Sequence, residues 1–234
     1  MDSQDGGGPD LTRPFNHASR SVLNHRHIER FEGDSLFARL ARAVCAAECL
    51  PRKELYEAWE VARRVRRRMR GGRVVDLAAG HGLLAWTLIL LDDTTPDALC
   101  VDTRRPKSAG RLEATLTERW PRLSGRVRFE EAGIGEAEIR PGDLAASVHG
   151  CGELTDEVLD AAIAARARVA VLPCCHALAR CDTGKLEGWV DGPLAVDLTR
   201  AARLRGAGYR VHTARIPEEI TPMNRLLMGW PPGS

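Results

Sequence analysis

Long apolar runs are missing from this sequence. None of its 234 residues lie in an uncharged apolar stretch of the roughly 20 residues that a membrane-spanning helix needs. The first residues are rich in glycine and aspartate, and they lack the basic and apolar regions of a signal peptide. We therefore expect a cytoplasmic protein without a membrane partner.

The sequence also has few lysines and a small net charge. Only three of the 34 basic residues are lysine, and the formal net charge is +2. So small a charge gives no overall field that would attract nucleic acid. The seven cysteines are an odd number in a chain of intracellular character, which argues against a disulfide framework. The hydrophobic fraction of 44% is that of an ordinary globular protein.

Three segments are expected along the chain. Residues 1–20 are rich in small and polar residues, which predicts a disordered tail. Residues 21–71 contain apolar residues at helical spacing, which predicts an N-terminal helical extension. Residues 72–234 alternate short apolar runs with helical patterns, which indicates an α/β domain with a largely parallel sheet.

The last two of the seven expected strands depart from this alternation. They lie at Tyr209–Thr213 and Arg225–Gly229, and the link between them is too short for a crossover helix. Because parallel neighbours need such a crossover, the link predicts a hairpin-like reversal and an antiparallel last strand. A plain dinucleotide-binding domain lacks this feature.

A strand, a small-residue turn and a helix open the α/β domain. The apolar pair Val74-Val75 leads to Asp76, and a second strand ends in Asp102. The turn between the first strand and its helix consists of Ala78, Ala79, Gly80, His81 and Gly82. Its glycines would let the backbone approach a ligand, and the following helix offers free N–H groups. An acid at the tip of the second strand is placed to accept hydrogen bonds from ribose hydroxyls. The pattern predicts a nucleotide-like ligand, with an NAD-type fold or a structural turn as alternatives.

Two polar boxes follow later strands. Residues 147–156 read Ser-Val-His-Gly-Cys-Gly-Glu-Leu-Thr-Asp, and residues 173–176 read Pro-Cys-Cys-His. Strand ends on this side of an open α/β sheet line the ligand crevice, so we expect the two boxes to face each other. His149 or His176 could then act as a general base that takes a proton from a hydroxyl or a nitrogen of a substrate.

The cysteines of these boxes allow further interpretations. Cys174 is a candidate nucleophile. The residue types also suit zinc, but adjacent cysteines chelate one ion awkwardly and no C-x-x-C pair exists, so we assign no metal site. Its weak candidate ligands are Cys151, Cys174, Cys175, His176 and Cys181. Alternatively, the cysteines simply pack as small apolar residues at strand ends.

Taken together, these motifs resemble the class I SAM-dependent methyltransferases over about residues 50–230. The turn is similar to their acid-x-Gly-x-Gly-x-Gly motif, with Ala78 in place of the first glycine. The resemblance implies a Rossmann-like seven-stranded α/β sheet with an antiparallel last strand, and S-adenosyl-L-methionine (SAM) as cofactor. The SAM-binding residues would be Asp76, Ala78, Gly80, His81, Gly82, Asp102 and His149.

The two boxes resemble those of a methyltransferase-like group that includes tRNA acceptor-stem 2′-O-methyltransferases. We name His149, His176 and Cys174 as candidate catalytic residues. The resemblance and a run of arginines at residues 63–70, which would neutralise phosphates, favour RNA as acceptor. The alternatives are a small-molecule acceptor, a non-catalytic SAM-fold binding protein, and a metal- or redox-responsive protein.

Overall fold

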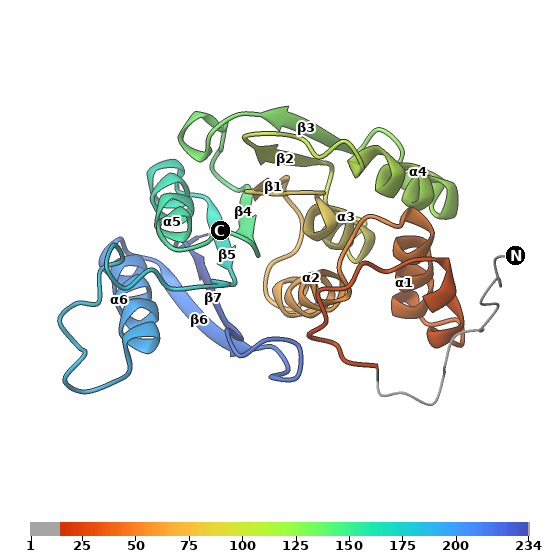
Figure 1. The fold of residues 1–234 in the computed structure, drawn as a ribbon. Helices are drawn as coiled ribbons and strands as arrows, with labels where there is room; N and C mark the ends of the chain where they lie inside the picture. Colours follow the sequence, from red (N-terminus) through yellow and green to blue (C-terminus); the bar gives the residue numbers. More distant parts are fainter. Residues whose placement is uncertain (1–14, 234) are drawn as a thin grey trace, which may run out of the picture.

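A seven-stranded mixed sheet forms the centre of the molecule in the computed structural model, which describes residues 15–233 (Figure 1). The strands are β1 (Val74–Leu77), β2 (Ala98–Asp102), β3 (Val127–Glu131), β4 (Leu144–Ser147), β5 (Arg168–Val171), β6 (Arg210–Arg215) and β7 (Arg225–Trp230). The helices are α1 (Leu36–Ala47), α2 (Arg52–Arg66), α3 (Leu83–Leu90), α4 (Ala109–Arg119), α5 (Glu153–Ala165) and α6 (Gly192–Gly206), with short 3-10 turns η1 (His25–Arg30), η2 (Pro121–Leu123) and η3 (Ile134–Glu136).

Most of the predicted disordered tail, residues 1–14, lies outside the described residues. The segment after it contacts the start of α2, because the backbone N–H groups of Arg52 and Lys53 donate to the carbonyls of Ser21 and Ser19 at 3.0 Å each. The division into a tail, a helical extension and a SAM-binding domain stays a prediction.

The strand order is β3-β2-β1-β4-β5-β7-β6. Strands β1 to β5 pair in parallel, whereas β7 is antiparallel to both β5 and β6. The hairpin predicted from the short link between the last two strands is therefore confirmed. Its position matters because β7 inserts between β5 and β6, which places β5 inside the sheet.

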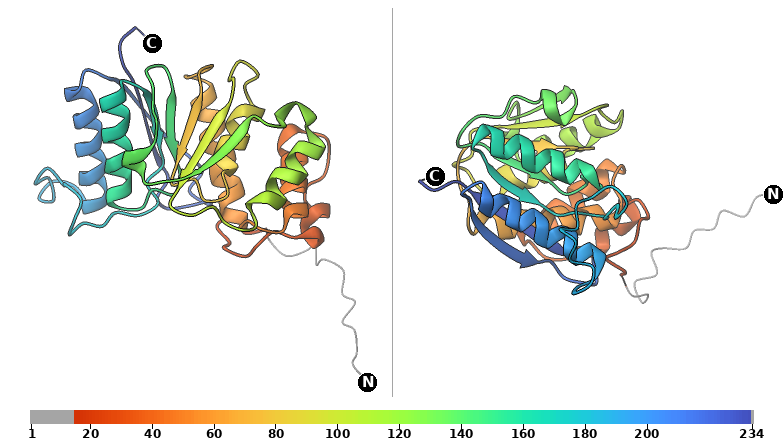
Figure 2. Two further views of the ribbon diagram at one scale, coloured as in Figure 1. Left: turned by 90° about the horizontal axis from the view of Figure 1, so that it is seen from above. Right: turned by 90° about the vertical axis from the view of Figure 1, so that its left-hand side faces the viewer.

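Helices cover both faces of the sheet (Figure 2). Helices α1 to α4 pack on one face, where α1 contacts α4 and α2 contacts α3, and α5 and α6 pack side by side on the other. All eight residues of α3 are buried, including Trp86, which is 1% exposed. The uninterrupted apolar run after the glycine turn is thus a helix buried on all sides rather than an amphipathic one.

Helix ends follow local capping chemistry. Helix α1 begins after Ser35, whose Oγ accepts a hydrogen bond from the N–H of Ala38 at 3.1 Å. Helix α2 ends at Arg66. The guanidinium of Arg66 donates to the carbonyl of Met69 at 3.2 Å, so the chain after α2 folds back over the last turn of the helix.

The turn before α3 packs tightly against its neighbours in the sheet. Gly82 has a φ of +76°, in the left-handed region, and a Cβ added there would lie 2.7 Å from Cys100 Sγ and 2.9 Å from the Phe129 ring. Only glycine satisfies both the backbone angle and the space. The start of α3 is therefore held close to β2 and β3.

We predict that Gly82→Ala lowers the free energy of unfolding by about 2–4 kcal/mol, because left-handed strain and overpacking add together. Gly125→Ala is the matched control, since Gly125 has a φ of +71° with no atom within 4 Å of the added Cβ. The control carries only the strain of about 1–2 kcal/mol. Urea denaturation of both variants measures the difference, and equal losses would contradict the close packing at Gly82.

Candidate active site

The predicted site residues lie at the carboxyl ends of the parallel strands. The glycine turn follows β1, Asp102 ends β2, His149 follows β4 and Cys174 follows β5. Because β2, β1, β4 and β5 are adjacent and parallel, these ends meet at one edge of the sheet. This edge is where open α/β sheets bind ligands.

Three residues of the turn are left-handed. The φ angles are +54° at Ala78, +53° at Gly80 and +76° at Gly82. No atom lies within 4 Å of a Cβ built on Gly80, so its backbone faces open space. Ala78 adopts a conformation that normally favours glycine, as the family motif would have there. The turn thus offers backbone to a ligand at Gly80 and stores strain at Ala78.

Asp102 shapes the same turn. Its Oδ2 accepts a hydrogen bond from the N–H of Gly80 at 2.8 Å. Its Oδ1 has longer contacts, at 3.4 Å to Thr103 Oγ1 and 3.5 Å to the N–H of Arg104. One carboxylate oxygen therefore fixes the glycine turn, and the other retains capacity to accept hydrogen bonds from a ligand.

Asp76 is buried inside this arrangement. It is 1% exposed, and its Oδ2 accepts a hydrogen bond from the N–H of Ala85 at 3.1 Å. Burial raises the pKa of Asp76 to about 8, the Ala85 bond opposes the rise, and the charge of Asp102 adds to it. Asp76 thus ties β1 to the first turn of α3. Its role as a SAM-binding residue stays a prediction.

One histidine lies within the turn and another follows β4. His81 lies between the glycines, and its Nε2 is 2.8 Å from Ser108 Oγ, just before α4. His149 follows β4, and its Nε2 is 4.0 Å from Glu54 Oε2 on α2. A small cavity separates these elements; it is lined by Leu50, Glu54, Ala58, Ala79, His81, Leu83, Leu84, Val148 and His149. Helix α2 therefore contributes directly to the edge of the sheet where the predicted site lies.

Burial favours the uncharged forms of both His149 and Glu54. Burial lowers the pKa of His149 to about 4, and the positive charge of Lys53 adds to the effect. Burial raises the pKa of Glu54 to about 7, with Glu57 adding to the rise and Lys53 opposing it. At neutral pH the imidazole is uncharged and the Glu54 carboxyl is near its midpoint.

Three cysteine thiols converge in the loops that follow β4 and β5. The Sγ atoms of Cys151, Cys174 and Cys175 all lie within 4.8 Å of one another, and those of Cys151 and Cys174 are 2.6 Å apart. Burial raises the pKa of the Cys174 thiol well above its ordinary value, and its two neighbours add to the rise. Cys174 is thus a thiol at neutral pH, which does not favour the nucleophile predicted for it.

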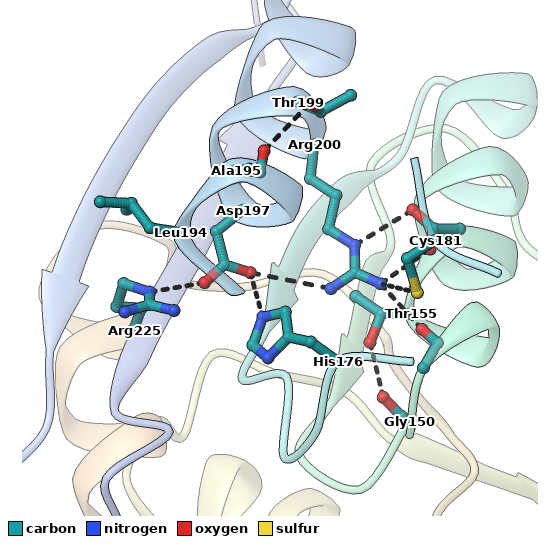
Figure 3. Close-up of polar contacts among 12 residues, drawn as sticks. Gly150, Thr155, His176, Cys181, Leu194, Ala195, Asp197, Thr199, Arg200 and Arg225 are labelled. Carbon is teal, nitrogen blue, oxygen red and sulfur yellow. Dashed lines mark hydrogen bonds and ion pairs between the residues drawn. The ribbon is translucent and has the colours of Figure 1, made fainter. Parts of the chain in front are cut away.

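His176 lies in a different environment (Figure 3). Its side chain is 2% exposed, and its Nε2 is 2.7 Å from Asp197 Oδ1 on α6. Asp197 Oδ2 accepts a hydrogen bond from Arg225 Nε on β7 at 2.6 Å. Burial would raise the pKa of Asp197, but the bonds from His176 and Arg225 outweigh it and hold that pKa below its ordinary value. The imidazole thus links the loop after β5 to α6, and its predicted catalytic role gains no support from this position.

Cys181 is separated from the other box cysteines. It is buried, and its Sγ lies 3.7 Å from the guanidinium of Arg200. Arg200 is 2% exposed and donates two hydrogen bonds to the carboxylate of Asp156, at 3.1 and 2.7 Å (Figure 3). Sequence reasoning did not find Arg200 or Asp197, because single charged residues on an amphipathic helix usually face solvent.

The first box leads directly into α5, which begins at Glu153 after Gly152. Thr155 therefore lies inside the helix and does not cap its N-terminus. Thr155 Oγ1 instead donates to the carbonyl of Gly150 at 2.5 Å, inside the first turn of the helix. The hydroxyl closes the loop that carries Cys151, so it acts on the loop rather than on the helix N–H groups.

Three arginines of the run on α2 form ion pairs within the protein. Arg63 and Arg64 form ion pairs with Glu60, and Arg66 is buried beside Asp92 at 3.4 Å. The exposed arginines are Arg67, Arg68 and Arg70. The phosphate-binding surface predicted from the run is therefore reduced to three residues beyond the end of α2.

A sheet of order 3-2-1-4-5-7-6 with a glycine turn after β1 and an acid ending β2 defines the class I methyltransferase fold. Residues 53–182 match the family described as a methyltransferase domain. The chain belongs to this family. No curated protein sequence matches it significantly.

Solved structures agree with this fold. Magnesium protoporphyrin IX methyltransferase from Synechocystis PCC 6803 has a TM-score of 0.51 and 15% identity, over 87% of this chain and 92% of its own. The small RNA methyltransferase HEN1 has a TM-score of 0.52 and 14% identity, over 76% of this chain and 26% of its own. An O-methyltransferase family protein from Burkholderia thailandensis has a TM-score of 0.47 and 19% identity, over 92% of this chain and 66% of its own. The chain thus spans slightly less than two thirds of the Burkholderia protein. The two structures with TM-scores above 0.5 support the fold alone, because both are less than 25% identical to this chain.

Within residues 15–233, no helix has both the length and the apolar character needed to cross a membrane.

We predict that Ala78→Gly raises the free energy of unfolding by about 0.5–1 kcal/mol, because removal of the left-handed Cβ strain outweighs the added entropy of the unfolded chain. Ala79→Gly is the control, since Ala79 is 6% exposed and has no positive φ. The free energy of unfolding of this control should fall by about 0.5–1 kcal/mol or more. Denaturant unfolding of both variants tests the sign, and destabilisation by Ala78→Gly would be inconsistent with the backbone described.

Proposed function

We propose that the protein is a SAM-dependent methyltransferase. The observation that carries the proposal is the pairing of the open backbone at Gly80 with Asp102, whose Oδ2 holds the turn and whose Oδ1 remains available. A nucleoside with two ribose hydroxyls fits this combination of close backbone approach and carboxylate acceptor. Membership of the methyltransferase domain family supports SAM as that nucleoside.

The neighbouring residues fit the remaining parts of the cofactor. SAM would supply a methyl group on a positively charged sulfur. The Glu54 carboxyl lies across the small cavity from the glycine turn, where an ionised carboxylate would attract that positive charge. His149 is neutral and borders the same cavity, so its imidazole is free to accept a proton from a hydroxyl or nitrogen acceptor, but its pKa of about 4 makes it a weak base. Transfer would depend chiefly on positioning and on the exclusion of water.

For the acceptor, RNA is the class we propose to test first. The resemblance of the two boxes to RNA-modifying enzymes supports it, as do the exposed arginines after α2. The ion pairs of Arg63 and Arg64 with Glu60 weaken the electrostatic part of that argument. A small-molecule acceptor is the second candidate, because none of the contacts described for the two boxes is specific to nucleic acid.

Calorimetry with SAM and with S-adenosylhomocysteine tests cofactor binding directly. Incubation with methyl-labelled SAM and fractionated cell extract then identifies the acceptor class, when the labelled RNA, protein and small-molecule fractions are counted separately. Failure to bind either nucleoside would refute the proposal. Binding without transfer to any fraction would leave a non-catalytic SAM-fold protein as the better description.

We predict that Asp102→Ala weakens SAM binding by at least about tenfold, because two hydrogen bonds from the ribose to a charged acceptor are lost. Thr103→Ala is the control, since Thr103 is exposed and its hydroxyl is 3.4 Å from the same carboxylate. It should bind SAM with unchanged affinity. Calorimetry measures both constants, and unchanged binding by Asp102→Ala would refute the ribose assignment.

We predict that SAM affinity increases as the pH rises from about 6 to about 8. The reason is that Glu54, with a pKa of about 7, becomes ionised and attracts the cation. The groups that face it are Lys53 and Glu57 on α2, His149 after β4 and His81 in the turn. Because Glu54 is about half protonated at pH 7, binding there should release up to about half a proton per SAM, which calorimetry in buffers of different ionisation enthalpy detects.

Glu54→Gln should bind SAM with a flatter pH profile and without that proton release. The surface variant Glu118→Gln is the control and should behave as the original protein does, because Glu118 is exposed on α4. A Glu54→Gln variant that keeps the full pH dependence would show that another group governs it.

A further inference from the structure

We propose that Cys151, Cys174 and Cys175 form a binding site for one thiophilic metal ion, with Zn²⁺ as the expected ion, and that its fourth coordination position is open. The three Sγ atoms lie within 4.8 Å of one another. Thiolates on one tetrahedral zinc ion, each about 2.3 Å from the metal, stand about 3.8 Å apart. The 2.6 Å between Cys151 and Cys174 would open by about 1 Å to reach that spacing.

The backbone holds the two cysteine loops together without a metal. The loops follow β4 and β5, which are adjacent parallel strands, and the N–H of Gly152 donates to the carbonyl of Cys175 at 3.4 Å. Gly152 has a φ of +56°, and a Cβ there would lie 3.2 Å from the Cβ of Ala177. The glycine after Cys151 thus permits the close approach, so the sulfurs are brought together by the fold itself.

The adjacent cysteines are less awkward in this backbone than in a regular strand. Along a strand, the side chains of Cys174 and Cys175 would point to opposite faces. Strand β5 ends at Val171, however, and the chain bends at Cys174. Both sulfurs therefore lie within reach of Cys151, and the objection drawn from the sequence does not apply to this geometry.

Three thiolates at this spacing would favour a cation. Like charges this close are unfavourable unless a positive ion lies among them. Soft thiolate ligands select Zn²⁺ or Cu⁺ over Mg²⁺ and Ca²⁺. Each thiol that binds gives its proton to the buffer, so binding one Zn²⁺ releases up to three protons and tightens as the pH rises.

The other candidate ligands are engaged elsewhere, which leaves the fourth position open. His176 pairs with Asp197, and Cys181 is buried beside Arg200. Cys151 and Cys175 are exposed, so this side of the cluster faces solvent. Structural zinc sites have four protein ligands, whereas three protein ligands and an open position are typical of sites that bind water or a substrate atom.

Titration of the reduced, full-length protein with Co²⁺ under anaerobic conditions tests the site. We expect one Co²⁺ per chain with thiolate-to-cobalt charge-transfer absorption, displaced by one equivalent of Zn²⁺. Cys151→Ser, Cys174→Ser and Cys175→Ser should each weaken metal binding by about 100-fold or more. Cys49→Ser is the matched control, because Cys49 lies at the end of α1 outside the cluster, and it should bind like the original protein.

Several results would overturn the proposal. The absence of thiolate–cobalt absorption in the reduced protein would do so, as would equal metal binding by the three cluster variants and Cys49→Ser. A Cys151–Cys174 disulfide in the isolated protein, together with no metal affinity after reduction, would show a redox pair instead. Circular dichroism of each variant separates loss of the site from loss of the fold, and competition with a chromophoric zinc chelator gives an independent affinity.

Discussion

The parallel pairing of β2, β1, β4 and β5 is the constraint on which the candidate site depends. Parallel strands end at the same edge, so the glycine turn, Asp102, His149 and Cys174 meet there although they span almost 100 residues of sequence. The pairing also requires crossovers, which α3 supplies between β1 and β2 and α5 supplies between β4 and β5. Insertion of β7 beside β5 then keeps the second cysteine loop away from an exposed sheet edge.

Close packing behind the glycine turn fixes the position of its backbone. Gly82 lies against Cys100 and Phe129 without room for a Cβ, and Asp76 bonds to Ala85 across the junction of β1 and α3. These contacts hold the backbone of the turn from behind, so its front can remain open at Gly80. A site built on a strand end and a fully buried helix is more precise than one built on a free loop, because surrounding side chains fix its position.

Sequence periodicity was sufficient for the sheet, its terminal hairpin and the glycine turn, since each rests on local chemistry or on link length. It could not assign partners to the box residues. His149 and His176 both follow strands, yet one borders the small cavity of α2 and the other pairs with Asp197 on α6. That distinction depends on which helix packs against each loop. The two boxes were expected to face each other, but the convergence of Cys151 with Cys174 in particular depends on the register of β4 and β5.

For three acidic groups near this edge, Asp76, Glu54 and Cys174, burial favours the protonated form. The pKa of Asp76 is raised to about 8 and that of Glu54 to about 7, and the thiol of Cys174 is also shifted upward. Each group would be ionised more readily if a cation were bound nearby. An edge of this kind suits positively charged ligands. A bound sulfonium or metal ion stabilises the ionised groups and so takes the place of their protons. The burial of these groups therefore makes ligand binding and proton release two parts of one equilibrium.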